Sequence, residues 1–122
     1  MRDEKLYLED LVEAAESIKQ MIEDVSLERF ETDTTLQRAV LLNFTIIGEA
    51  ARRLSDETRK QYPEIAWSSI IGFRNIIVHA YFSLNLETVW KAATRRVAPL
   101  IEQIRAILRH DFSEDRSDRS GD

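Results

Sequence analysis

The sequence predicts an all-α protein, an up-down helical bundle of four main helices plus a short helical turn. Glycine and proline are scarce, with 3 and 2 residues respectively in a chain of 122, which leaves too few turn residues for a fold of many strands. Apolar residues recur every three or four positions over long stretches, as on the buried face of an amphipathic helix. The length fits one domain, and 43% hydrophobic with 32% charged residues is an ordinary globular balance.

The first helix is predicted over about Leu6 to Val25, because apolar positions there follow the i, i+3, i+4, i+7 spacing while Glu and Lys occupy the other side. Its apolar stripe consists of Leu11, Ala14, Ala15, Ile18, Met21, Ile22 and Val25. The residues that follow, Ser26 to Asp33, are predicted to form a polar connection.

A second helix is predicted from Thr34 to about Leu54, and Asp33 or Thr34 is expected to cap its first turn with a side-chain oxygen. Gly48 lies in the middle of this helix. Glycine there costs up to about 1 kcal/mol relative to alanine, so it indicates close contact with another helix. Glu49 has two interpretations: a carboxylate at the edge of the buried stripe, or one that orients a nearby cation such as Arg74.

The third main helix is predicted over Ile65 to Phe82. Before it, the segment SDETRKQYP, Ser55 to Pro63, is predicted to form a short helical turn that the proline ends. The segment from Ile65 is apolar on nearly all sides, so we expect this helix to be buried.

The last helix is predicted from Leu86 to about His110, with Asn85 as its cap. A packing seam with 4-3-4-3 spacing runs along it, formed by Leu86, Trp90, Ala93, Val97, Leu100, Ile104 and Ile107. Pro99 falls inside the seam and predicts a bend between Arg95 and Pro99, because proline removes a backbone bond. We expect the folded domain to cover residues 1–112 and the polar residues 113–122, SEDRSDRSGD, to form a disordered tail.

Composition excludes several classes of protein. There is no cysteine, and the two histidines, His79 and His110, are far apart, so neither a disulfide framework nor a zinc site is expected. No apolar run approaches the roughly 20 residues of a membrane span, and we expect a cytoplasmic protein that does not bind membranes. The net charge of -5 disfavours bulk electrostatic binding of nucleic acid, although arginines cluster locally around Arg52 and Arg53 and again at Arg95 and Arg96.

The stretch RNIIVHAY, Arg74 to Tyr81, places polar residues inside the longest apolar run of the chain. Histidine both gives and takes a proton near neutral pH, and arginine binds phosphate through a planar fork. Together they suit RNA cleavage without a metal. His79 would take the 2′-OH proton or protonate the leaving 5′-oxygen, while Arg74 would stabilise charge on the phosphate oxygens. The alternative is a lone core histidine that is only hydrogen-bonded.

The spacing of Arg74 and His79 along the sequence limits how the two side chains can act on one phosphate. Asn75 and His79 are four residues apart and share a helix face, so Asn75 could hold the His79 ring or satisfy a backbone group. Arg74 and His79 are five apart and diverge by roughly 140° on a regular helix. Either the helix ends or distorts before His79, or two copies pool their residues across a two-fold axis, which predicts a homodimer.

The same residues carry a resemblance. The spacing from Arg74 to His79 resembles the R-x4-6-H signature of the HEPN superfamily, whose helical domains are often ribonucleases, and Tyr81 completes R-x4-H-x-Y, the form typical of its HepT toxin branch. The flanking segments IGEAARRLSDE and YPEIAWSSIIGFRNIIVHAYF are similar to that branch in order and spacing. The resemblance covers about Leu36 to Phe112, with one departure, Ala66 where relatives commonly have proline.

The resemblance implies a homodimeric ribonuclease toxin of a type VII-like toxin–antitoxin system, without metal or cofactor. Arg74 and His79 would be the catalytic pair, with Asn75 supporting them. A cognate minimal nucleotidyltransferase antitoxin would neutralise the toxin by transferring AMP from ATP to Tyr81. Arg52 and Arg53 are candidates for RNA binding. The substrate RNA is open between transfer RNA and messenger RNA.

Two other interpretations stand beside this one. A non-catalytic helical dimer could use the same residues to bind a nucleotide or a partner protein, such as the nucleotidyltransferase. A helical dimer could also use its polar residues only to fix packing, with Tyr81 as a core aromatic residue whose hydroxyl is hydrogen-bonded.

Overall fold

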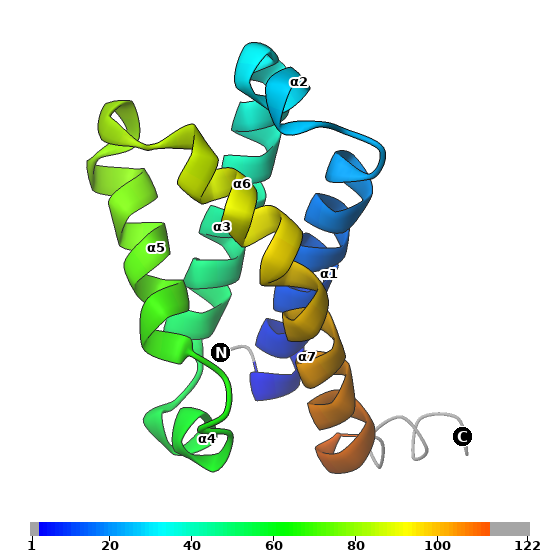
Figure 1. Ribbon diagram of the computed structural model, residues 1–122. Helices are drawn as coiled ribbons and strands as arrows, with labels where there is room; N and C mark the ends of the chain where they lie inside the picture. The colour runs from blue at the N-terminus through cyan, green and yellow to red at the C-terminus, as the bar shows by residue number, and fades with distance from the viewer. Residues whose placement is uncertain (1–2, 113–122) are drawn as a thin grey trace.

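The computed structural model describes residues 3–112, and over that range every element is a helix, which confirms the all-α class (Figure 1). The elements are α1 (Glu4–Ile22), α2 (Leu27–Thr32), α3 (Thr34–Arg53), α4 (Asp56–Gln61), α5 (Trp67–His79), the 3-10 turn η1 (Tyr81–Ser83), α6 (Leu86–Arg95) and α7 (Val97–Asp111).

Helix α3 is central to the arrangement. It packs against α1 on one side and α5 on the other, and α7 packs against α1. In the view of Figure 1, α6 crosses in front of α3. The core between α1, α3 and α7 is built from the apolar stripes that the spacing predicts, including the fully buried Leu11, Ile18, Val40 and Ile104. The segments α1, α3, α5 and α6–α7 correspond to the four predicted main helices, and α4 to the predicted short turn.

The segment from Ser26 to Asp33 differs from its prediction as a polar connection. It contains α2, whose first turn is capped by the Ser26 hydroxyl accepting a hydrogen bond from the Arg29 backbone N–H at 3.1 Å. Phe30 on this helix is fully buried and its ring lies 5.3 Å from that of Trp90. The Phe30 side chain, together with a hydrogen bond that the Phe30 carbonyl accepts from Gln37 Nε2 at 2.8 Å, holds a short helix whose other residues are mostly polar.

Two features of α3 confirm the sequence prediction. Asp33 caps the helix by accepting a hydrogen bond from the Leu36 N–H at 3.0 Å. Gly48 marks close contact with α5, because a Cβ added at this position would lie 2.1 Å from the Cβ of Arg74. Glycine thus lets the two helices approach at the level of Arg74.

Helix α5 is shorter and more exposed than predicted. It begins at Trp67, whose indole N–H donates to the Tyr62 carbonyl at 3.0 Å, and it ends at His79. Ile76 and Val78 are 52% and 46% exposed, so the prediction of a buried helix is wrong for a single chain. The reason is packing, since α5 lies against α3 and no other helix of residues 3–112 covers its outer face.

The last predicted helix is interrupted. Helix α6 ends at Arg95 and α7 begins at Val97, with Arg96 between them. Pro99 has no N–H to donate to the Arg95 carbonyl, which explains why the break falls where a bend was predicted. Asn85 caps α6 as predicted, accepting from the Thr88 N–H at 3.1 Å. The predicted disordered tail, residues 113–122, lies outside the described residues.

Candidate active site

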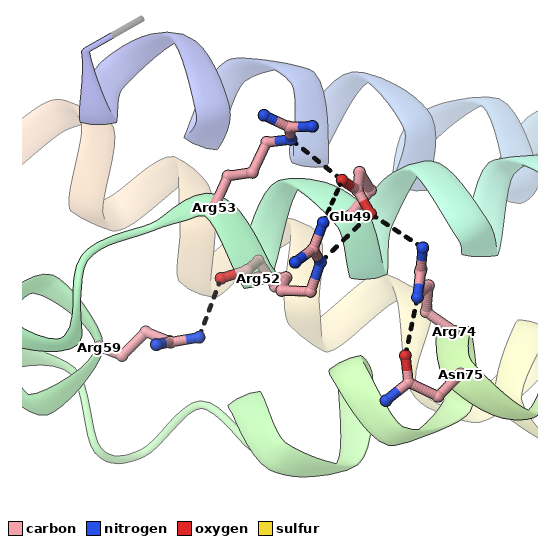
Figure 2. A network of polar contacts seen from close by, with 7 residues as sticks. Glu49, Arg52, Arg53, Arg59, Arg74 and Asn75 are labelled. Atoms are coloured by element: carbon pink, nitrogen blue, oxygen red, sulfur yellow. Dashed lines mark hydrogen bonds and ion pairs between the residues drawn. The ribbon is translucent and has the colours of Figure 1, made fainter. Parts of the chain in front are cut away.

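The candidate site starts from an ion pair between α3 and α5. The Arg74 guanidinium lies 3.3 Å from the Glu49 carboxylate, measured from Nη2 to Oε2 (Figure 2). The close approach at Gly48, the residue before Glu49, brings the two side chains together. The contact agrees with the interpretation of Glu49 as a carboxylate that orients Arg74.

Arg74 is held on two sides. Its Nη1 donates to the Asn75 side-chain oxygen at 2.9 Å, and its Nε is buried without an acceptor among residues 3–112. The Arg74 side chain is 21% exposed, so only part of the guanidinium faces solvent. Asn75 therefore bonds to Arg74, and not to the His79 ring or to a backbone group.

Glu49 gathers two more arginines at the end of α3. Its Oε1 accepts from Arg52 Nη2 at 2.8 Å and from Arg53 Nε at 3.0 Å (Figure 2). The hydrogen bond from Arg52 is the largest cause of a lowered Glu49 pKa; burial opposes it, and the bond from Arg53 and the charges of Arg52 and Arg74 add to it. The same carboxylate raises the pKa of Arg52.

This cluster of four side chains is positively charged within an acidic chain. Three arginines and one ionised Glu49 give a local charge of +3 − 1 = +2, against -5 for the whole protein. Phosphate groups are attracted to such a cluster, and arginine binds them through paired N–H donors. The structure thus groups Arg52, Arg53 and Arg74, the three arginines that the sequence analysis selected.

His79 is the last residue of α5 and is exposed. The helix continues from Arg74 through His79, which contradicts the alternative that it ends or distorts before His79. Five residues on a regular helix separate the two side chains by roughly 140°. A single chain therefore does not bring Arg74 and His79 to one point.

Tyr81 lies just beyond α5, in η1. Its side chain is 37% exposed, and its ring meets that of Phe82 edge to face at 5.3 Å. The Tyr81 hydroxyl has no hydrogen-bond partner within residues 3–112. This exposure disagrees with the alternative of a core aromatic residue with a bonded hydroxyl.

Exposed apolar side chains on α3, α5 and η1 are a feature that sequence analysis missed. Phe82 is 99% exposed, and Leu42 and Ile46 on α3 are exposed together with Ile76 and Val78 on α5. The apolar run predicts burial of α5, but it does not distinguish burial within a chain from burial between chains. That distinction needs the positions of α3 and α5.

Two further observations bear on chemistry. Among the described residues, no group of three or more His, Asp or Glu side chains is placed to hold a metal ion. Within residues 3–112 no helix is both long and apolar enough to cross a membrane.

The fold and the site define a class of protein. The all-helical fold agrees with the HEPN-type domain that the sequence resemblance implies, and the R-x4-H-x-Y stretch runs from Arg74 on α5 to Tyr81 in η1. The family profile described as "Ribonuclease HepT-like" matches residues 11–107, and the chain belongs to this family.

Three relatives illustrate the similarity. The chain is 33% identical over 99 residues to "Probable ribonuclease HepT" of Thermococcus cleftensis, covering 81% of this chain and 90% of that one. It is 30% identical over 111 residues to a "Putative RNase" of Caldanaerobacter subterraneus subsp. tengcongensis, covering 91% and 99%. A "Putative RNase" of Methanocaldococcus jannaschii is 28% identical over 106 residues, covering 87% and 97%. No solved structure matches the chain.

Proposed function

We propose that the protein is a metal-independent endoribonuclease, the toxin of a type VII-like toxin–antitoxin system, acting on RNA in the cytoplasm. One observation carries the proposal: Arg74 of α5 belongs to a positively charged cluster, and the same helix exposes His79. Membership of the HepT-like ribonuclease family, and relatives that are named as ribonucleases, support it.

The proposed reaction uses the RNA's own 2′-hydroxyl as nucleophile. Its oxygen attacks the adjacent phosphorus, the bond from phosphorus to the 5′-oxygen breaks, and the products carry a 2′,3′-cyclic phosphate and a 5′-hydroxyl. His79 takes the proton from the 2′-OH or gives one to the leaving 5′-oxygen. Arg74 stabilises the negative charge that grows on the phosphate oxygens. DNA lacks the 2′-OH and is not cut.

A homodimer is part of this proposal, because one chain does not converge Arg74 and His79. Across a two-fold axis, Arg74 of one chain and His79 of the other can face the same phosphate. Exposed apolar side chains on α3, α5 and η1 support such an interface, since exposed apolar surface marks association sites; they are Leu42, Ile46, Ile76, Val78 and Phe82.

Tyr81 is proposed as the site where the activity is turned off. A cognate minimal nucleotidyltransferase would catalyse attack of the Tyr81 phenolic oxygen on the α-phosphorus of ATP, with release of pyrophosphate and of the phenolic proton. The exposure of Tyr81 and its unbonded hydroxyl support its accessibility. AMP two residues from His79 adds bulk and negative charge where RNA phosphate binds, so it excludes RNA sterically and repels it.

The experiment combines variants with total RNA. We expect the wild-type dimer to produce cyclic-phosphate ends in the presence of EDTA, and Arg74→Ala and His79→Ala to lose cleavage and growth arrest. His110→Ala is the matched control, since His110 lies at the far end of α7, and it should cleave like wild type. Intact mass after expression with the nucleotidyltransferase should rise by one or more AMP units, and Tyr81→Phe should prevent this.

A folded wild-type dimer that binds RNA without producing cyclic phosphate would contradict the catalytic proposal. That outcome would favour a non-catalytic module that binds a nucleotide or a partner protein. Full activity of His79→Ala would remove His79 from the proposed mechanism and leave Arg74 as a phosphate-binding residue.

A further inference from the structure

An open cavity of about 660 Å³ lies on another side of α5 from the candidate active site. Most of its lining residues come from α3, α5, α6 and α7. In Figure 1, α5 is on the left, α7 is at lower right, and α6 crosses in front of α3 between them. Its apolar lining includes Phe44, Ile47, Ile70, Phe73, Val97 and Leu100, and none of Arg74, His79 or Tyr81. Small-molecule sites typically have about 300–1,000 Å³ and a mostly apolar lining.

The α6–α7 edge of this cavity is positively charged. Lys91, Arg95 and Arg96 line it. Lys91 is paired with Glu87 at 3.4 Å, whereas Arg95 and Arg96 have no acidic partner among residues 3–112. Two unpaired guanidinium groups beside an apolar floor favour an anionic group there.

The two arginines lie where α6 ends and α7 begins. Arg96 occupies the N-cap position of the 15-residue helix and no side chain caps its first turn. Val97, the first residue of α7, lines the cavity. Because α6 ends where α7 begins, the opposite partial charges of the two helix ends offset each other, and the positive charge here comes from the two guanidinium groups. On the α5 side the rim carries Glu64, which repels a second negative group and restricts the anion to the α6–α7 end.

We propose that this cavity binds a small amphipathic anion, a compound with an apolar or aromatic body and one carboxylate, sulfonate or phosphate head. The head lies at Arg95, Arg96 and the start of α7, and the body covers Ile70 and Phe73 on α5. The site is separate from the proposed RNA-cleaving residues, and the proposal does not depend on ribonuclease activity.

The test compares two probes of nearly equal shape by fluorescence titration. One is 8-anilinonaphthalene-1-sulfonate, and the other is N-phenyl-1-naphthylamine, which has the same rings without the sulfonate. We expect the folded wild-type protein to bind the sulfonate at one site per chain and the neutral probe roughly tenfold more weakly. The double variant R95Q/R96Q should bind the sulfonate only as well as the neutral probe.

Two more variants make the test specific. R38Q/R109Q removes two exposed arginines that do not line the cavity, and it should keep wild-type affinity for both probes. Ser69→Trp places an indole at an exposed position of the cavity lining and should block both probes, with circular dichroism confirming the helical fold. Equal affinity for the two probes, unchanged sulfonate binding by R95Q/R96Q, or no binding by folded wild-type protein would each overturn the proposal.

Discussion

Replacing Gly48 with alanine tests the contact that positions Arg74. The new Cβ would lie 2.1 Å from the Arg74 Cβ and 2.8 Å from its Cγ, whereas carbon atoms in contact are about 3.5–4.0 Å apart. Helices α3 and α5 must therefore move apart by roughly 1.5 Å. No glycine has positive φ among the described residues, so backbone strain contributes nothing to the effect.

Two opposing terms set the size of the effect. Alanine is favoured over glycine inside a helix by about 1 kcal/mol, and overpacking costs typically about 1–3 kcal/mol and sometimes more. We expect Gly48→Ala to lose up to about 2 kcal/mol of unfolding free energy, which corresponds to a melting temperature lower by up to roughly 10 °C. Displacement of Arg74 should also reduce RNA cleavage.

Gly72→Ala is the matched control, because it makes the same substitution inside α5. A Cβ at Gly72 would meet no atom within 4 Å in the single chain, so this variant should gain about 1 kcal/mol from helix propensity. Urea unfolding followed by circular dichroism measures both variants, and their difference removes the shared propensity term. If Gly48→Ala had the same free energy of unfolding as Gly72→Ala, the close approach of α3 and α5 would be refuted.

Three other predictions follow from contacts outside this pair of glycines. Glu49→Gln should lower the rate of RNA cleavage about tenfold, because Arg74 is released. It should strengthen RNA binding at low salt, because one negative charge is removed from the cluster. Unchanged steady-state kinetics would contradict the positioning role of Glu49. Burial and the hydrogen bond with Asp111 raise the pKa of Tyr62 to about 12, whereas a tyrosine in the unfolded chain has a pKa near 10. The free energy of unfolding should therefore fall as pH rises from about 10 to 12, and it should fall less in Tyr62→Phe. Phe30→Ala should cost about 3–5 kcal/mol by urea unfolding, and a loss below 1 kcal/mol would show that α2 is not docked.

The parts of the fold that sequence predicts well are those set by local chemistry. Asp33 and Asn85 were predicted as caps because short polar side chains satisfy free N–H groups at helix starts, and both do so. Pro99 predicts a bend because it cannot donate the backbone hydrogen bond of its own helix, and the helix is interrupted there, between α6 and α7. Gly48 predicts a close helix contact because glycine inside a helix is less stable than alanine, and the contact is with Arg74 on α5.

The errors concern contacts between distant segments. Ser26 to Asp33 is mostly polar, and its helix depends on the packing of Phe30 against Trp90, 60 residues along the chain. The exposed face of α5 has an apolar sequence like that of a core helix, and only the arrangement around α3 distinguishes them. Spacing predicts that Asn75 holds the His79 ring or satisfies a backbone group, but its side-chain oxygen accepts a hydrogen bond from the Arg74 guanidinium.

The central claim is a cleavage site that combines Arg74 of one chain with His79 of the other, and mixing two inactive variants tests it most directly. Arg74→Ala and His79→Ala dimers are each expected to be inactive. After subunit exchange, about half of the dimers are mixed, and each of these has one site with both residues intact. We predict that the mixture recovers about a quarter of wild-type RNA cleavage. A mixture that exchanges subunits, as mass spectrometry would establish, and still cleaves no RNA would contradict the shared site.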